Sequence, residues 1–381
     1  MGNRINYSRI IEYLSIKARK QKIPLSGTLE LTPRCNMNCK MCYIRMNENE
    51  MKKIGEELSS EEWIRIIKEA VEEGMIMLLL TGGEAILYKD FKKIYLEAQK
   101  LGVFVSINTN ATMIDDEWLE FFSENPPAKF NITIYGGSND TYLKLCGNPK
   151  GFDQLKRAVE GIQKLGIEIA LNCTITKQNV QDMAKIYEFG KEHNLKVHTT
   201  TYNFPPVRKE GIDDLELNRL LPKEAAKAKV YMQWYALGKE GFYNKAVQVA
   251  KGNYQLENDE ESCGEIIGEK VLCAAGRSNF WVTWDGRMLP CGMIPDFSVM
   301  IKNRKFCEAW KQIVDYTETI TLSPECKKCK KKHICAPCAA KLKSETGSYQ
   351  KKAEYLCEYT TEYIIFMKKA KEYLENNKIE K

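Results

Sequence analysis

Three cysteines fall within one short stretch at the spacing C-x3-C-x2-C, namely Cys35, Cys39 and Cys42. A tight loop with this spacing can turn three thiolates inward onto one small inorganic core. Three thiolates on a four-iron cubane leave one iron without a protein ligand. An open iron can bind and reduce another molecule, so the spacing indicates a site of chemistry. The structural alternative is three buried or zinc-bound cysteines.

The spacing differs from the common zinc patterns, in which a C-x2–4-C pair has a distant second pair, and from a lone C-x-x-C redox pair. It resembles the signature of the radical S-adenosylmethionine (SAM) superfamily, C-x3-C-x-Φ-C, with Met41 in the Φ position. Many members carry an aromatic residue there. The resemblance implies that Cys35, Cys39 and Cys42 hold a catalytic [4Fe–4S] cluster and that Met41 lies beside the adenine of SAM.

The composition of the 381-residue chain excludes several classes of protein. Charged residues make up 28% and hydrophobic residues 44%, and the formal net charge of +6 does not call for nucleic acid. The longest apolar run, residues 75–80, is too short to span a bilayer, and the first residues contain no hydrophobic signal segment. We therefore expect a cytoplasmic protein with no membrane partner. In that reducing compartment fourteen cysteines favour metal or cluster ligation over disulfides.

Strand-like and helix-like segments alternate from Gly27 onward, which predicts an α/β protein with a parallel sheet. Strands are expected at 28–32, 75–81, 103–108, 129–135, 167–174 and 195–201. Helices are expected at 59–73, 91–101, 115–123, 151–165 and 180–193. The family resemblance implies a partial (β/α)6 TIM-like barrel with its functional loops at the strand C-termini. The periodicity alone leaves an open, doubly wound sheet as an alternative.

Four regions are expected along the chain. A basic amphipathic helical extension covers 1–26, the barrel 27–202, a bridging helical region 203–262 and a small cysteine-rich α+β domain 263–381. The bridging region contains two helix-like segments, 222–237 and 242–256.

Two glycines and a carboxylate follow the second predicted strand as Gly82, Gly83 and Glu84. Glycines let the backbone approach a ligand closely, and a carboxylate can accept hydrogen bonds from an ammonium group. A bare Gly-Gly-Glu is usually only a turn. Its position on the strand after the cysteine loop matches the radical SAM motif that holds the methionyl amine, so the resemblance implies that all three residues contact SAM.

Polar residues alternate toward the end of the third strand as Ser106, Asn108 and Asn110, and Asn172 occurs near the end of the fifth. In the family such residues often meet the ribose or carboxylate of SAM, and we expect this role here. The alternative is that they simply close a strand. Relatives often place an aspartate where this chain has Tyr135, so no role is carried over to that position.

Eight of the nine cysteines in the last third of the chain form a pattern, and Cys307 lies outside it. Residues 280–290 read as a β-hairpin with an Asp285-Gly286 turn, which should bring Cys273 and Cys291 together. A zinc ribbon could use two C-x2-C pairs, but it would leave four of the eight without a purpose. The eight are Cys263, Cys273, Cys291, Cys326, Cys329, Cys335, Cys338 and Cys357.

This set resembles the SPASM domain, whose pattern is C-x9–15-G-x4-C, then C-x2-C-x5-C-x3-C, then a final cysteine. The last internal gap here is two residues rather than three. The family's interleaved ligation implies two auxiliary [4Fe–4S] clusters, and hence three clusters in all. One would be held by Cys263, Cys273, Cys291 and Cys338, and the other by Cys326, Cys329, Cys335 and Cys357.

The resemblance implies reductive cleavage of SAM to a 5′-deoxyadenosyl radical, with an electron donor such as ferredoxin or flavodoxin, and hydrogen abstraction from a substrate. SPASM relatives mostly modify peptides, so oxidative cross-linking of a ribosomally made peptide is the leading expectation. Gly292 occupies the position where the sulfatase-maturing branch carries aspartate, which counts against that activity. No separate N-terminal peptide-recognition domain is expected in residues 1–25.

Two alternatives remain open at this point. The substrate could be a small molecule of haem-pathway or sugar type. The chain could also be a non-catalytic iron–sulfur electron-transfer protein or a zinc-binding protein. Outside the motifs, Cys146 follows the fourth strand, where it could lie near the active site, and His198 lies on the last barrel strand.

Overall fold

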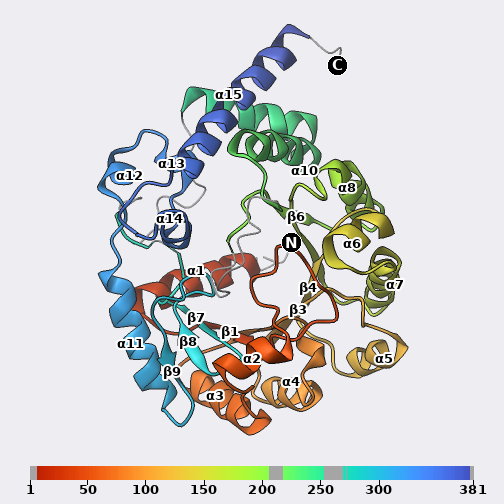
Figure 1. The fold of residues 1–381 in the computed structure, drawn as a ribbon, viewed down its shortest axis with the longest axis vertical. Helices are drawn as coiled ribbons and strands as arrows, with labels where there is room; N and C mark the ends of the chain where they lie inside the picture. The colour runs from red at the N-terminus through yellow and green to blue at the C-terminus, as the bar shows by residue number, and fades with distance from the viewer. Residues whose placement is uncertain (1–6, 206–217, 253–268, 272, 378–381) are drawn as a thin grey trace, which may run out of the picture.

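A curved nine-stranded sheet forms the framework of the computed structural model, which describes residues 7–205, 218–252, 269–271 and 273–377. Its spatial order is β6-β5-β4-β3-β2-β1-β7-β8-β9 (Figure 1). The strands are β1 (Ser26–Glu30), β2 (Met77–Thr81), β3 (Phe104–Thr109), β4 (Lys129–Thr133), β5 (Ile169–Thr174), β6 (Val197–Thr200), β7 (Asn279–Val282), β8 (Arg287–Leu289) and β9 (Val299–Met300).

Strands β1 to β6 are all parallel and each pairs with the next strand in the chain. The α/β class, the six predicted strands and the partial barrel are therefore confirmed. The carboxyl ends of all six strands point to one edge of the sheet, where loops can place side chains together.

Helices α3 to α8 cover the outside of this barrel (Figure 1). The five predicted helices are all present, and α2 and α6, which the sequence did not predict, are additional. The helices up to this point are α1 (Tyr7–Gln21), α2 (Glu48–Ile54), α3 (Ser60–Glu72), α4 (Phe91–Lys100), α5 (Asp116–Glu124), α6 (Asn139–Cys146), α7 (Gly151–Lys164) and α8 (Met183–Glu192). Short 3-10 turns precede α4 (Ala85–Leu87) and α8 (Val180–Asp182).

Helix α3 illustrates why these segments fold as predicted. Its cap Ser59 accepts a hydrogen bond from the N–H of Glu62, which satisfies one donor of the first turn. Trp63, Ile66, Ile67 and Ala70 recur at helical spacing and are all buried. One face of the helix is thus fixed against the sheet and the other faces solvent.

Strands β7 to β9 extend the same sheet beyond β1. The predicted hairpin is present as the antiparallel pair β7 and β8, and β7 in turn pairs in parallel with β1. A Cβ atom on Gly27 would collide with the ring of Phe280, so this pairing requires a glycine in β1. The indole of Trp281 also donates a 2.7 Å hydrogen bond to the buried carboxylate of Glu30.

The bridging region contains α10 (Pro222–Lys251), which consists of two helical segments separated by a kink, in agreement with the two helix-like segments expected there. The two segments join at Gly238, whose φ of 66° and ψ of 179° interrupt the helical backbone. Residues 253–256 of the second expected segment lie outside the described residues. Helix α10 packs along α15 at one end of the molecule (Figure 1). The later helices are α11 (Phe306–Thr319), α12 (Pro324–Lys328), α13 (Lys332–Cys335), α14 (Ala339–Thr346) and α15 (Glu354–Asn376).

A buried ion pair joins the end of the barrel to the C-terminal helices. Arg219 donates a 2.6 Å hydrogen bond to Glu345 of α14, and their side chains are only 9% and 12% exposed. The Arg219 guanidinium lies 3.3 Å from the ring centroid of Tyr355 in α15. Tyr202, just after β6, donates a 2.5 Å hydrogen bond to the same carboxylate. Four segments distant in sequence thus meet at Glu345.

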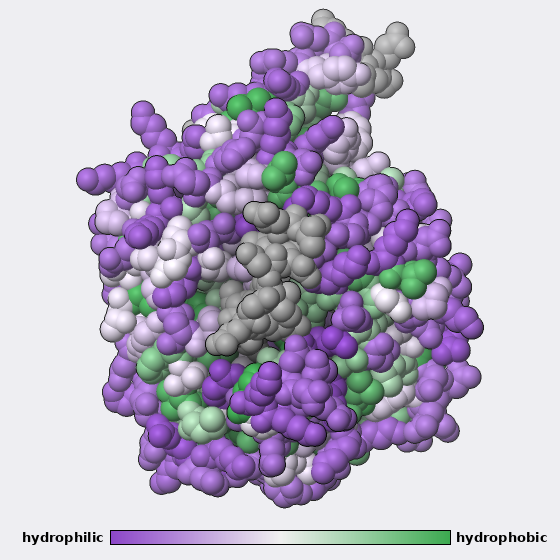
Figure 2. Space-filling model, viewed as in Figure 1, coloured by the Kyte–Doolittle hydropathy of each residue, from purple (hydrophilic) through white to green (hydrophobic). Residues whose placement is uncertain are grey.

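The surface visible in Figure 2 is mostly hydrophilic, with hydrophobic side chains in small separate groups. Among the described residues, no helix has the length and apolar character needed to cross a membrane.

Replacing Glu345 by glutamine should strongly destabilise the protein, because it leaves Arg219 buried without a counter-charge. The expected loss in the free energy of unfolding is about 3–5 kcal/mol, measured by urea unfolding under anaerobic conditions. The control is Asp315→Asn, which breaks an exposed pair with Lys311 (61% and 76% exposed) and should cost under about 1 kcal/mol. Equal losses in the two variants would contradict this account.

Candidate active site

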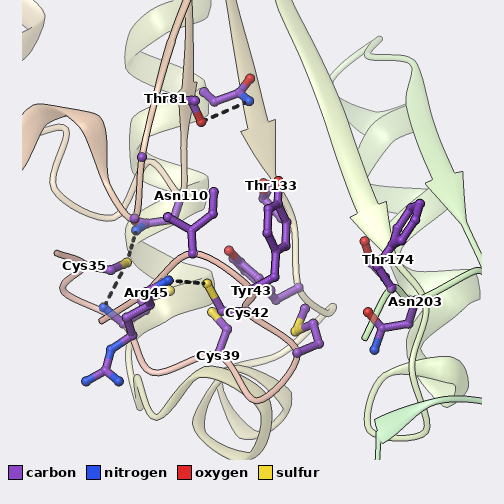
Figure 3. Close-up of a pocket in the computed structure, with 18 of the residues that line it drawn as sticks. Cys35, Cys39, Cys42, Tyr43, Arg45, Thr81, Asn110, Thr133, Thr174 and Asn203 are labelled. Atoms are coloured by element: carbon purple, nitrogen blue, oxygen red, sulfur yellow. Dashed lines mark hydrogen bonds between the residues drawn. The ribbon is translucent and has the colours of Figure 1, made fainter. Parts of the chain in front are cut away.

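A cavity of about 310 Å³ opens where the carboxyl ends of β2 to β6 meet the cysteine loop (Figure 3). Each of these five strands ends in a threonine, and all five threonines line the cavity. They are Thr81, Thr109, Thr133, Thr174 and Thr200. The cavity wall is therefore a row of hydroxyl groups opposite the cysteine sulfurs.

All three cysteines of the loop line this cavity (Figure 3). The N–H of Met37 donates to Cys35 Sγ at 3.4 Å, and the N–H of Arg45 donates to Cys42 Sγ at 3.2 Å. Donors at a sulfur stabilise the thiolate, which is the form that binds metal, but at Cys35 burial outweighs the Met37 N–H and raises the pKa to about 12.

The Gly-Gly-Glu motif holds the cysteine loop against β2. The N–H of Gly83 donates to the carbonyl of Thr32, and the N–H of Glu84 donates to the carbonyl of Arg34, both at 2.8 Å. A Cβ atom on Gly82 or Gly83 would collide with these same carbonyl oxygens. The two glycines thus allow the backbone after β2 to approach the backbone of the cysteine loop. Contact with a ligand is not needed to explain them, since the protein contact alone excludes a side chain.

A fourth cysteine lies beside the loop. The buried thiol of Cys146, at the end of α6, donates a hydrogen bond to Cys39 and lowers the pKa of Cys39, and the hydroxyl of Tyr135 lowers it further. Carbonyls at the end of α6 also accept hydrogen bonds from the backbone N–H groups of Asn38 and Lys40. Helix α6 therefore supports the loop from the side opposite β2. The spacing pattern did not reveal this, because α6 is short and distant in sequence.

Glu84 is buried and does not line the cavity. Its Oε2 atom accepts a 2.8 Å hydrogen bond from the N–H of Asn110, and its buried Oε1 atom has no hydrogen-bond partner among the described residues. Burial raises the pKa of this carboxyl to about 7, against the lowering effect of the Asn110 N–H. Glu84 thus links the ends of β2 and β3 from behind the cavity wall.

The structure separates the predicted SAM contacts into two groups. Met41, Gly82, Gly83, Asn108 and Asn110 line the cavity, whereas Glu84, Ser106 and Asn172 do not. Sequence reasoning missed the strand-end threonines as a set, although a threonine at each strand end was visible. It also missed several other residues of the cavity wall, including Arg45, Tyr135 and Asn203.

Several of the C-terminal cysteines lie near one another among the described residues, Cys357 near Cys335, Cys326 and Cys329, and Cys273 near Cys338. Burial raises the pKa of Cys357, and the nearby thiols of Cys335, Cys326 and Cys329 raise it further. Burial likewise raises the pKa of Cys273, with a contribution from Cys338.

Cys291 packs on the same hydrophobic cluster as Cys338. Cys263 lies outside the described residues. Within the described ranges, no three His, Cys, Asp or Glu side chains converge closely enough for a single metal ion.

Comparison with known proteins identifies the barrel. Residues 29–190, which carry both the cysteine loop and the Gly-Gly-Glu motif, match the model of the radical SAM superfamily. This chain is an enzyme that contains a radical SAM domain.

Relatives of this radical SAM enzyme differ in function. It is 24% identical to the AdoMet-dependent heme synthase of Methanosarcina barkeri over 341 residues, 86% of this chain and 94% of that protein. It is 32% identical to the sporulation killing factor maturation protein SkfB of Bacillus subtilis over 166 residues, 44% of this chain and 39% of SkfB.

Among solved structures, Streptococcus suis SuiB bound to its precursor peptide SuiA has a TM-score of 0.63 at 16% identity. The match covers 93% of this chain and 82% of SuiB, and at this identity it shows the fold.

The residues of the cavity fit the group that the superfamily uses. A [4Fe–4S] cluster presents separate irons to separate thiolates, so the three loop cysteines need not converge on one point. Their sulfurs already accept backbone hydrogen bonds. Amide side chains at Asn108 and Asn110 provide donors and acceptors for a polar ligand such as SAM.

Changing Gly83 to alanine should displace the cysteine loop, because the new Cβ atom would meet the carbonyl oxygen of Arg34. Overpacking of this kind costs about 1–3 kcal/mol, and the displaced loop should bind less iron. Iron per chain and the thermal midpoint are the two measurements. Gly55→Ala is the control, since a Cβ atom there would make an ordinary 3.8 Å contact with Asp285. Full iron content in Gly83→Ala would refute the packing role.

Proposed function

We propose that this radical SAM enzyme removes a hydrogen atom from a ribosomally made peptide and leaves it oxidatively cross-linked. The observation that carries the proposal is the hydrogen-bonding wall of the cavity, which has no carboxylate among its described residues. Threonine hydroxyls and asparagine amides both donate and accept, as a peptide backbone requires. Among the described lining residues there is no carboxylate, and the charged ones are Arg45 and Lys341.

A [4Fe–4S] cluster at Cys35, Cys39 and Cys42, with SAM bound, would supply one-electron cleavage of SAM to methionine and a 5′-deoxyadenosyl radical. A ferredoxin or flavodoxin is the proposed electron donor. In this proposal Gly82, Gly83, Asn108 and Asn110 hold SAM. Glu84 keeps the ends of β2 and β3 in register, while Ser106 and Asn172 stabilise their strands.

The strand-end threonines would then position the peptide so that one C–H bond faces the radical. Holding reactants in an aligned geometry accounts for much of the rate enhancement in such sites. The cavity wall also limits water, which would otherwise compete for a reactive intermediate. These are roles of binding and positioning, and they follow from the placement of the side chains around the cavity.

The two cysteine groups near the C-terminus are proposed to hold two auxiliary [4Fe–4S] clusters. The mutual proximity of Cys326, Cys329, Cys335 and Cys357 supports the first. The proximity of Cys273 and Cys338 supports the second. Such clusters would accept the electron that a substrate loses on oxidation.

A tetrapyrrole is the second candidate substrate. The match to the AdoMet-dependent heme synthase extends over 86% of this chain, whereas the match to SkfB extends over 44%. This coverage favours a small-molecule substrate, whereas the hydrogen-bonding cavity wall favours a peptide. Because the chain is an enzyme, the non-catalytic electron-transfer and zinc-binding alternatives no longer apply.

Three clusters predict about twelve irons per chain in the reconstituted enzyme. Cys357→Ala should lose about four of them, because its group would lack one ligand. Cys307→Ala is the control, since Cys307 is exposed and lies outside both the signature and the two C-terminal groups, and it should keep the full number. Iron analysis with visible absorbance is the measurement. An unchanged iron content in Cys357→Ala would contradict the second cluster group.

Incubation of the reduced enzyme with SAM and short peptides encoded beside its gene should yield a peptide lighter by two hydrogens. Mass spectrometry with fragmentation would locate the modified residue. The Cys39→Ala variant is the control and should produce neither 5′-deoxyadenosine nor modified peptide. If SAM is cleaved only when iron coproporphyrin III is added, and every peptide stays unchanged, the tetrapyrrole becomes the substrate.

A further inference from the structure

A second cavity, of about 360 Å³, adjoins the first on the side of the C-terminal helices. It lies between β6, α10, α13 and α15, and it shares Thr200, Tyr202 and Lys341 with the first cavity. A molecule with its reactive part in the first cavity can therefore extend into the second. His198, on β6, also lines this second cavity.

Two lysine side chains line this cavity, Lys229 from α10 and Lys341 from α14. Lys229 Nζ lies 4.4 Å from the ring centroid of Tyr363 and 5.4 Å from that of Tyr359. Lys341 Nζ lies 4.7 Å from the ring centroid of Tyr202. These aromatic faces hold the cations in place, but they supply no negative charge.

No aspartate or glutamate is among the described residues that line the second cavity. Burial lowers the pKa of Lys229 to about 8, and repulsion from Lys341 and Lys245 lowers it further. A cavity that holds two such cations favours an anion between them.

We propose that this second cavity binds a carboxylate of the substrate between Lys229 and Lys341. The proposal rests on the proposed function and extends it, since the peptide would carry an acidic side chain or a free C-terminus near the modified residue. The hydroxyls along β6 would line the path between the carboxylate and the reacting carbon. A propionate of a tetrapyrrole offers the same chemistry, so the test separates the two sources.

A rival role for the lysines follows from Cys335, which lines the same cavity and belongs to a proposed cluster group. Thiolates and an iron–sulfur cluster carry negative charge, which the two cations could balance. In that case the cavity would have no preference for a carboxylate ligand. Loss of either lysine would instead change the auxiliary cluster.

The test measures binding of glutarate and of its neutral diamide, glutaramide, to the reconstituted enzyme by equilibrium dialysis. SAM is kept saturating so that the site for its own carboxylate is filled. The wild-type enzyme should bind glutarate at least tenfold more tightly than glutaramide. Lys229→Gln and Lys341→Gln should each reduce glutarate binding at least fivefold. Lys227→Gln, an exposed lysine of the same helix, is the control and should retain full binding.

Equal binding of the two probes by the wild-type enzyme would overturn the proposal. So would an unchanged preference for glutarate in both lysine variants. A shifted midpoint potential of the auxiliary clusters in Lys229→Gln, with glutarate binding intact, would establish the rival role.

Competition then identifies the source of the carboxylate and separates this proposal from the peptide function. Displacement of glutarate by an N-acetylated glutamyl peptide, but not by its glutaminyl counterpart, is the expected result. Displacement by iron coproporphyrin III alone would keep the carboxylate site and overturn the peptide substrate. Failure of glutarate to bind, with peptide modification intact, would overturn only the carboxylate site.

Discussion

Two backbone hydrogen bonds between the end of β2 and the cysteine loop determine the geometry of the active site. They join Gly83 to Thr32 and Glu84 to Arg34, and the two glycines leave no room for a side chain between the two segments. The loop itself contains little regular structure, so its shape depends on what it is attached to. β2 is a buried strand near the middle of the sheet. Attachment to this strand therefore fixes the position of the cysteine loop relative to the barrel.

The parallel sheet places further side chains beside the cysteine loop that is attached to β2, and together they form the candidate active site. Because all six barrel strands end at the same edge, one threonine from each of β2 to β6 lines the cavity beside the loop. On the far side α6 supports the loop through its last carbonyls and through the hydrogen bond from Cys146 to Cys39. Opposite faces of the loop are thus held by different elements, which leaves the three sulfurs turned toward the cavity.

Local patterns predicted the strands, the five long helices and the cysteine loop, since each depends on spacing over a few residues. Local patterns could not predict the interactions between segments that are distant in sequence. The pairing of β7 with β1 and the contact of Cys146 with Cys39 join residues far apart in sequence. Glu84 follows the second strand as expected, but its side-chain direction depends on Asn110, which follows the next strand. The packing of both segments of α10 along α15 likewise joins residues far apart in sequence, whereas the break at Gly238 between them agrees with the local pattern.

The C-terminal region also contributes to the walls of the two cavities. Lys341 of α14 lines both cavities, and α14 is fixed to the end of β6 through Glu345, Arg219 and Tyr202. The position of that lysine relative to the strand-end threonines is therefore set by a buried, charged contact with little freedom to adjust. A substrate that spans the two cavities would meet hydroxyl groups near the cysteine loop and cations farther out. The order of polar groups along this path can thus select which substrates bind and in which orientation they bind.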